Sequence, residues 1–394
     1  HVKTTLRDQE CKFSKMSLTV KQHAESMAEY LEEGAKQALA LGNRGPVRFQ
    51  DDRSLHPDIT DAFSRCGFYV FTGVLEQPEL DDLKDEVKRA LERAPVSNQS
   101  KLDQQGRPSL GADLSIPPFH LVAPLGDPVG GTERNAGRHP VKMVTPMPDA
   151  GSPSQVVQVI FGTLHILDSC LRLYGLPQLL KVAEAMNGSD FTPFNEAIFV
   201  KQPGLGAAVA WHQDATTHWD SPNLDEGTHG FNFMAQLYGC TAANAVWVVP
   251  GTHKQGKLDI SSLTEVGGDR ISGAVPMICD PGDVVMCNRQ VVHGSFANSS
   301  NDWRVSVGFG FHRKESVVGA SAKLLNGKVV RYDEARVKER SRMIAIAIDA
   351  RTQRYPNEER YHYKPLAGFE AENNFNEETR EQVVKNYNLL DLHI

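Results

Sequence analysis

The feature that most constrains the fold is a series of short β-rich runs, which begins near Gln155 and continues to Phe311. Turn signals such as Pro203-Gly204, Pro250-Gly251 and Pro281-Gly282 separate the runs. The runs cover residues 156–161, 196–201, 207–212, 231–237, 245–249, 284–287 and 305–311. Many short strands at such spacing are typical of a double-sheet jelly roll, the architecture of cupins. The sequence therefore predicts a double-stranded β-helix core.

Helical patterns flank this core, so the fold class that we predict is mainly β with flanking helices. Residues 18–41, 333–351 and 376–390 carry apolar or small side chains at helical spacing. The first methionine is Met16, so we set residues 1–15 aside as a tail that is left over from expression or disordered. The remainder divides into an N-terminal helical extension (16–60), a double-stranded β-helix domain (61–313) and a C-terminal helical extension (314–394).

Charge and composition exclude several classes of partner. The net charge is −7, with 42 basic and 49 acidic residues mixed along the chain, so no basic stripe predicts binding to nucleic acid. No stretch of about 18 apolar residues predicts a membrane span, and the start of the chain lacks the apolar region of a signal peptide. The six cysteines show no C-x₂-C pairing and suit free thiols in a reducing compartment. We expect a cytoplasmic protein.

The tetrapeptide Trp211-His212-Gln213-Asp214 carries the strongest chemical signal. His212 and Asp214 share one face of a strand, because side chains alternate with period two. With His293 on a neighbouring strand they form a 2-His-1-carboxylate set, which holds Fe(II) and leaves three positions open for a co-substrate and O₂. Arg304, eleven residues beyond His293, suits the distal carboxylate of 2-oxoglutarate, since a guanidinium donates two parallel hydrogen bonds. These residues predict an oxygenase.

The strand that contains Arg304 has two unlike faces. Arg304, Ser306, Gly308 and Gly310 share one face, and bulky residues occupy the other. We interpret the polar or empty face as space left for a ligand, with an edge strand and an exposed arginine as the alternative. Lys201 precedes the His-x-Asp strand, where it either adds positive charge near the pocket or is solvated.

The order of these motifs resembles the phytanoyl-CoA dioxygenase-like family of Fe(II)/2-oxoglutarate oxygenases. The resemblance runs from about Phe63 to Arg313 and rests on four motifs, namely residues 67–75, 211–214, 250–254 and the Pro281-Gly-Asp turn that leads to His293-Gly-Ser295 and Arg304. It implies that His212, Asp214 and His293 ligate iron, that Arg304 binds the distal carboxylate, and that Ser295 and Gln158 help to hold the co-substrate. The family's usual Asn-Gly turn appears here as Ala243-Asn244, which weakens that one assignment.

Residues 94–154 form a long segment rich in proline, glycine and polar residues. Such segments in compact domains are usually functional or disordered. Because this one precedes the first core strand, we expect a lid that shapes the substrate pocket together with residues 215–230. We also expect that shortening residues 124–140 leaves folding and iron binding nearly intact, since loop length changes closure entropy little.

The predicted reaction is oxidation, by default hydroxylation, of an unactivated C–H bond in a small organic metabolite such as a natural-product intermediate. Desaturation, epoxidation, ring formation and rearrangement stay open. Fe(II), 2-oxoglutarate and O₂ are the expected cofactor and co-substrates, and a homodimer is left open. One alternative is a jelly-roll metal protein, an isomerase or a small-molecule binding protein, that does not use 2-oxoglutarate. A zinc hydrolase is another, because a His₂Asp set also binds zinc.

Overall fold

The computed structural model describes residues 18–214, 229–323, 327–385 and 387. Two β-sheets face each other in these ranges. The eight-stranded sheet has the order β1 (Arg44–Gly45), β2 (Phe68–Phe71), β10 (Val284–Asn288), β7 (Gly230–Gln236), β12 (Arg304–His312), β5 (Thr192–Lys201), β4 (Val156–Phe161) and β3 (Phe119–Val122). The four-stranded sheet has the order β6 (Val209–His212), β11 (Val292–Ser295), β8 (Trp247–Val249) and β9 (Val275–Pro276).

The chain crosses between these two sheets again and again. From β5 onward it enters the four-stranded sheet at β6, returns at β7, crosses for β8 and β9, returns at β10, crosses for β11 and returns at β12. As a result β5, β6 and β7 pair with β12, β11 and β10 from a later part of the chain, as in a jelly roll. The predicted double-stranded β-helix core is confirmed.

Helices cover the outer face of the eight-stranded sheet. They are α3 (Pro57–Cys66), α4 (Gln77–Glu92), α5 (Thr163–Ile166), α6 (Asp168–Tyr174), α7 (Pro177–Asn187) and α8 (Glu334–Arg354). On β12 the bulky residues Val305, Val307, Phe309 and Phe311 point into this helix-covered core. The opposite residues of β12 consequently face the four-stranded sheet, because side chains alternate along a strand.

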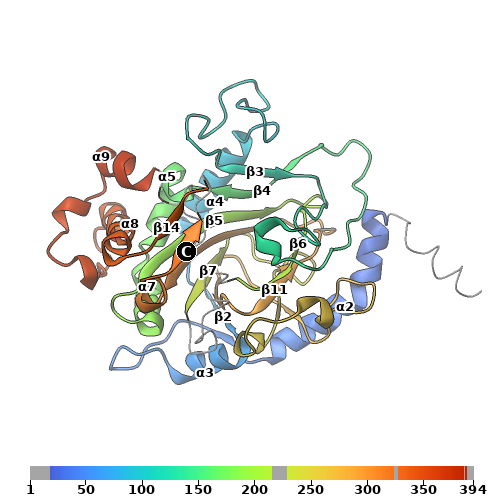
Figure 1. Ribbon diagram of the computed structural model, residues 1–394, viewed down its shortest axis with the longest axis horizontal. Coiled ribbons are helices and arrows are strands. Elements are labelled where there is room, and N and C mark those ends of the chain that lie inside the picture. The colour runs from blue at the N-terminus through green and yellow to red at the C-terminus, as the bar shows by residue number, and fades with distance from the viewer. Residues whose placement is uncertain (1–17, 215–228, 324–326, 386, 388–394) are drawn as a thin grey trace, which may run out of the picture.

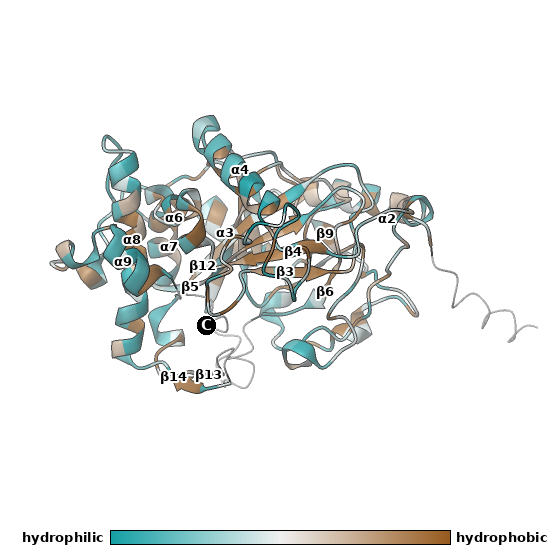
Figure 2. Ribbon diagram, turned by 90° about the horizontal axis from the view of Figure 1, so that it is seen from above, coloured by the Kyte–Doolittle hydropathy of each residue, from teal (hydrophilic) through white to brown (hydrophobic). Residues whose placement is uncertain are grey.

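Helix α2 (Val20–Ala40) covers the outer face of the four-stranded sheet. Its first turn is fixed by a capping box between Thr19 and Gln22, which satisfies two backbone N–H groups at the helix start. Tyr30 of α2 stacks on Trp247 of β8 with ring centroids 4.7 Å apart. The predicted helix at residues 18–41 is confirmed, and Figures 1 and 2 show α2 at the opposite end of the molecule from α8.

The C-terminal extension packs on the helical side of the core. Its main helix, α8, is the one predicted at residues 333–351, and Arg351 pairs with Glu79 of α4 at 2.6 Å. Of the helix predicted at residues 376–390, the structure describes residues 376–385 and 387, in which α9 (Glu377–Thr379) passes into a π-helical turn at Arg380–Val384; the other predicted residues lie outside the described ranges. A small hairpin of β13 (Ser321–Lys323) and β14 (Val329–Arg331) joins the core to α8. Among the described helices, none combines the length and apolar character of a membrane span.

The segment at residues 94–154 is more regular than its composition indicates. It contributes β3, which pairs with β4 at the edge of the eight-stranded sheet. The buried carboxylate of Asp127 accepts hydrogen bonds from the backbone N–H groups of Gly130 and Met143 at 2.8 Å each. Backbone hydrogen bonds from Leu125 to Leu205 and from Ala208 to Gly126, at 2.8 Å each, attach the segment to the core as well.

Candidate metal centre

The structure brings the three residues predicted as metal ligands together. His212 ends β6, Asp214 follows two residues later, and His293 lies opposite His212 on the adjacent strand β11. The carboxylate of Asp214 is 3.6 Å from Nε2 of His212 and 3.7 Å from Nε2 of His293. One ligand atom from each residue falls within 4.8 Å of the others, which is the spacing of atoms that share a metal ion.

Hydrogen bonds fix the tautomer of both histidines. Nδ1 of His212 lies 2.8 Å from the carbonyl of Ala210, and Nδ1 of His293 lies 2.9 Å from the carbonyl of Val291. A carbonyl only accepts, so each Nδ1 carries the hydrogen and each Nε2 keeps its lone pair. Both lone pairs point toward Asp214, the arrangement that metal-binding histidines use.

The charges of the three residues also suit a metal ion. Burial, followed by the neighbouring imidazoles, lowers the pKa of His212 well below its ordinary value, so its ring is neutral. Burial opposes the charged form of Asp214, but the nearby Arg138 and the two histidines hold the pKa of that carboxyl well below its usual range. Two imidazole nitrogens and one anionic oxygen fit Fe(II), and they fit zinc as well.

Trp211 and Gln213, which alternate with the ligands His212 and Asp214, anchor the end of the strand. Trp211 and Gln213 point away from the metal-binding face, because side chains alternate along the strand. Nε1 of Trp211 donates to the carbonyl of Asp269 at 2.6 Å, and the amide of Gln213 donates to Gly256 and Gln290 at 2.9 and 2.8 Å. These buried hydrogen bonds hold His212 and Asp214 in place.

Arg304 is buried at the start of β12 with few partners. Its side chain is 2% exposed, Nη1 donates to the carbonyl of Asn244 at 3.3 Å, and Nε has no hydrogen-bond partner within the described ranges. Burial lowers the pKa of Arg304 to about 10. A buried guanidinium with so few acceptors is costly unless an anion joins it.

Two neighbours of Arg304 complete this part of the interior. Lys201 lies directly opposite on β5 and is buried, so the solvated alternative is wrong; its Nζ donates to the carbonyls of Ala207 and Phe296 at 2.5 Å each. Ser295 precedes Phe296 and shares its face of β11 with His293, and its buried Oγ has no partner among the residues that the structure describes. Ser295 and Arg304 therefore both offer hydrogen-bond donors to the interior.

The side chain of Gln158 is bonded to the main chain near the metal-binding strand. The amide of Gln158 donates to the carbonyl of Ala208 at 3.1 Å, so it links β4 to the segment before β6.

A Cβ on Gly310 would lie 2.6 Å from Oδ1 of Asn232, so the interpretation of an empty space beside Gly310 is wrong, because the side chain of Asn232 fills that space. Gly308 is less crowded, with its nearest contact at 3.3 Å. The edge-strand alternative is wrong, since β12 lies between β7 and β5.

Sequence reasoning missed the residues that approach the centre from residues 94–154. Nη1 of Arg138 donates to Oδ1 of Asp214 at 2.8 Å, and the ring of His139 packs on that of His212 with centroids 4.4 Å apart. Burial lowers the pKa of His139 to about 3, so its ring is neutral. No strand or helix periodicity marks Arg138 or His139. From the sequence we could therefore predict a lid in this segment, but not which of its residues reach the metal centre.

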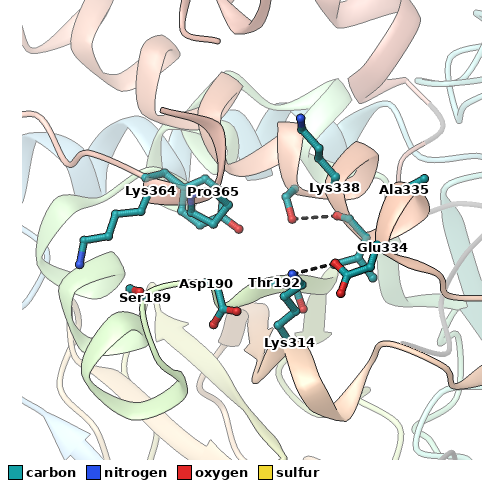
Figure 3. Close-up of a pocket in the computed structure, with 12 residues that line it drawn as sticks. Ser189, Asp190, Thr192, Lys314, Glu334, Ala335, Lys338, Lys364 and Pro365 are labelled. Carbon is teal, nitrogen blue, oxygen red and sulfur yellow. Dashed lines mark hydrogen bonds and ion pairs between the residues drawn. The ribbon is translucent and has the colours of Figure 1, made fainter. Parts of the chain in front are cut away.

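A separate cavity of about 490 Å³ lies beside α8, between the start of β5 and the end of β12 (Figure 3). Two of its lysines already form ion pairs, Lys314 with Glu334 and Lys364 with Glu184, each at 2.7 Å. None of the three clustered ligands lines this cavity. The metal centre is therefore the better candidate for the reaction site.

The fold and the cluster together define a double-stranded β-helix protein with a 2-His-1-carboxylate centre. Residues 155–306 match the model of the phytanoyl-CoA dioxygenase (PhyH) family. This range contains the three clustered residues and also Gln158, Ser295 and Arg304. The family resemblance that the motifs predict is thereby confirmed for this part of the chain.

Individual relatives match shorter stretches. The chain is 28% identical over 137 residues to the dioxygenase lolE1 of Epichloe uncinata, which covers 34% of this chain and 50% of that protein. It is 31% identical over 109 residues to phytanoyl-CoA dioxygenase 1 of Oryza sativa subsp. japonica, covering 25% of this chain and 37% of that one. The chain thus spans half or less of the length of these curated relatives. One similar solved structure is that of EctD from S. alaskensis with 2-oxoglutarate and 5-hydroxyectoine. The alignment covers 74% of this chain and 89% of the EctD chain, with 19% sequence identity and a TM-score of 0.47.

Proposed function

We propose that this chain is an Fe(II)- and 2-oxoglutarate-dependent dioxygenase that oxidises an unactivated C–H bond of a small organic metabolite, such as a natural-product intermediate. Hydroxylation is the expected outcome, with succinate and CO₂ as co-products. The observation that carries the proposal is a 2-His-1-carboxylate cluster in the same fold as two buried donor atoms, Oγ of Ser295 and Nε of Arg304, that have no partner in the described part of the chain.

Each part of the site has a task in this reaction. His212, Asp214 and His293 would hold Fe(II) and leave positions open for the co-substrate and O₂. Bound Fe(II) supplies the activation of O₂, coupled to oxidative decarboxylation of 2-oxoglutarate. Arg304 would bind the distal carboxylate through two parallel hydrogen bonds, with Ser295 donating a further one. The buried hydrogen bonds of Trp211 and Gln213 keep the ligand strand in register while substrate binds.

The buried donors also separate this proposal from its alternatives. A metal-dependent isomerase, a binding protein or a zinc hydrolase would use the three ligands without a dicarboxylate. Within the described residues, Arg304 would then keep one long hydrogen bond and the Ser295 hydroxyl none, and burying such donors without acceptors destabilises the protein. A bound dicarboxylate would accept hydrogen bonds from both Arg304 and Ser295.

The test compares Asp214→Ala with a control, Asp81→Ala, which removes a carboxylate from the exposed face of α4. The measurements are iron content after anaerobic loading and succinate formed from 2-oxoglutarate and O₂ across a panel of metabolites. We expect the parent and the control to form succinate, with stimulation by the true substrate. Asp214→Ala should lose the activity by at least about 100-fold, since it removes the only carboxylate ligand. Full activity in that variant contradicts the ligand assignment, and a parent that binds metal but never forms succinate favours an alternative.

A further inference from the structure

A second buried arginine lies beside the metal centre. Arg289 belongs to the turn between β10 and β11, and it is 4% exposed. Its guanidinium lies over the ring of Phe194, 3.9 Å from the centroid, and its Nη1 is 3.0 Å from Nε2 of His312. The backbone carbonyl of Arg289 accepts from the N–H of Asp214 at 2.9 Å. Phe194 and His312 thus fix the guanidinium, the backbone of Arg289 is bonded to that of the ligand Asp214, and the two charged side chains interact electrostatically.

Arg289 and Arg304 lie at opposite ends of the barrel interior. Arg304 begins β12, and His312, the partner of Arg289, ends it eight residues later. A strand rises about 3.3 Å per residue, so roughly 25 Å separates the two ends. A co-substrate that extends from the metal to Arg304 leaves the end near Arg289 to another molecule.

The guanidinium of Arg289 has fewer hydrogen-bond acceptors around it, among the described residues, than it has N–H donors. A guanidinium has five N–H donors, yet Nε of Arg289 is buried with no acceptor among the described residues, and Phe194 offers only a ring face. Arg138 reaches the centre from residues 94–154, donates to Asp214 through Nη1, and has a buried Nε that likewise lacks a partner there. Two arginines therefore share the neighbourhood of one carboxylate, and that carboxylate is already assigned to the metal.

Among the residues that the structure describes, the positive charges around the loaded centre outnumber the negative ones. Fe(II), Arg138, Arg289 and Arg304 bring five positive charges, whereas Asp214 and 2-oxoglutarate bring three negative ones. Lys201, if protonated, only adds to the excess. Burying positive charge without a counter-ion destabilises a protein. An additional bound anion is the simplest way to balance the charge of this site.

We infer that the substrate of this centre carries a carboxylate, which Arg289 receives beside Phe194, with Arg138 as the second cation. The inference rests on the proposed function and narrows its substrate class from any small metabolite to an organic acid. A planar carboxylate suits the fork of Arg289, because two of its oxygens can accept parallel hydrogen bonds. The apolar remainder of the substrate would lie over the centre, with one C–H bond near the metal.

The experiment uses protein loaded with Co(II) and saturated with N-oxalylglycine, an unreactive analogue of 2-oxoglutarate. Benzoate and decanoate are titrated by calorimetry, each against its neutral amide, benzamide or decanamide. We expect the carboxylates to bind at least about 10-fold more tightly than the amides, as charge-assisted hydrogen bonds contribute about 1.5–3 kcal/mol. Arg289→Gln should abolish this preference and Arg138→Gln should reduce it. Arg48→Gln, which changes an exposed arginine that pairs with Asp58 of α3, is the matched control.

The outcomes separate the inference from the proposed function. Equal binding of acids and amides by the parent overturns the inference while leaving succinate formation untouched. If Arg289→Gln and Arg138→Gln instead weaken N-oxalylglycine, the two arginines serve the co-substrate, and the inference is again wrong. If Arg289→Gln does not fold, Arg289→Lys keeps the charge without the fork, and Arg138→Gln still tests the second cation. Failure of the proposed function appears elsewhere, as a parent that binds neither N-oxalylglycine nor 2-oxoglutarate.

Discussion

Replacing Arg304 with leucine should have opposite effects on the ligand-free and the ligand-bound protein. The parent buries this guanidinium with one hydrogen bond of 3.3 Å. Arg304→Leu keeps bulk and removes an unpaired charge, so the ligand-free variant should unfold at or above the melting temperature of the parent. The same change removes a two-bond carboxylate clamp worth about 2.7 kcal/mol, so the apparent 2-oxoglutarate requirement should rise on the order of 100-fold.

Thermal unfolding with N-oxalylglycine makes this difference measurable. At a concentration of 100 Kd, the analogue should stabilise the parent by about 2.7 kcal/mol. For a variant that binds 100-fold more weakly, the same concentration equals Kd and stabilises by only about 0.4 kcal/mol. Arg304→Lys, which keeps the charge without the fork, should fall between the two. An unchanged 2-oxoglutarate requirement, or a large loss of stability in ligand-free Arg304→Leu, would refute this reasoning and make Arg304 a structural residue.

Three further predictions concern stability and the lid. Burial raises the pKa of the Asp269 carboxyl above its ordinary value of 3.8. Burying this side chain therefore costs no stability below pH 3.8, where it is neutral, and costs most above its pKa in the folded protein, where it is charged. The stability of Asp269→Asn relative to the parent should consequently rise with pH, as denaturant melts at several pH values would show. Gly34→Ala should cost about 1–3 kcal/mol in such melts, because its Cβ would lie 2.4 Å from the ring of Trp247. Replacing residues 124–140 with a Gly/Ser linker should weaken Co(II) binding in calorimetry, because the contact of this segment with Asp214 is lost; unchanged affinity would make the segment a bystander.

The sequence predicted the parts of this protein that local patterns encode. Strand alternation and turn signals sufficed for the two sheets, and the period of two placed His212 and Asp214 on one face. Arg138 could not be found in this way, because it meets Asp214 across 76 residues from a segment without periodicity. Gly310 was misread for a related reason: its small size serves the close approach of Asn232 on the neighbouring strand, which a single strand's pattern does not reveal.

The contact between Arg138 and Asp214 also changes what the lid segment does. We expected residues 124–140 to be replaceable without loss of iron binding, but the structure argues against this, since Arg138 holds one of the two oxygens of the ligand carboxylate. Oδ1, which accepts from Arg138, lies 3.6 Å from Nε2 of His212, and Oδ2 lies 3.7 Å from Nε2 of His293, so the hydrogen bond to Oδ1 favours metal binding through Oδ2. A carboxylate that offers one oxygen occupies one coordination position, and a 2-His-1-carboxylate centre needs its remaining positions for a chelating co-substrate and O₂. The segment thus supports the coordination chemistry itself, in addition to any part it takes in enclosing the substrate.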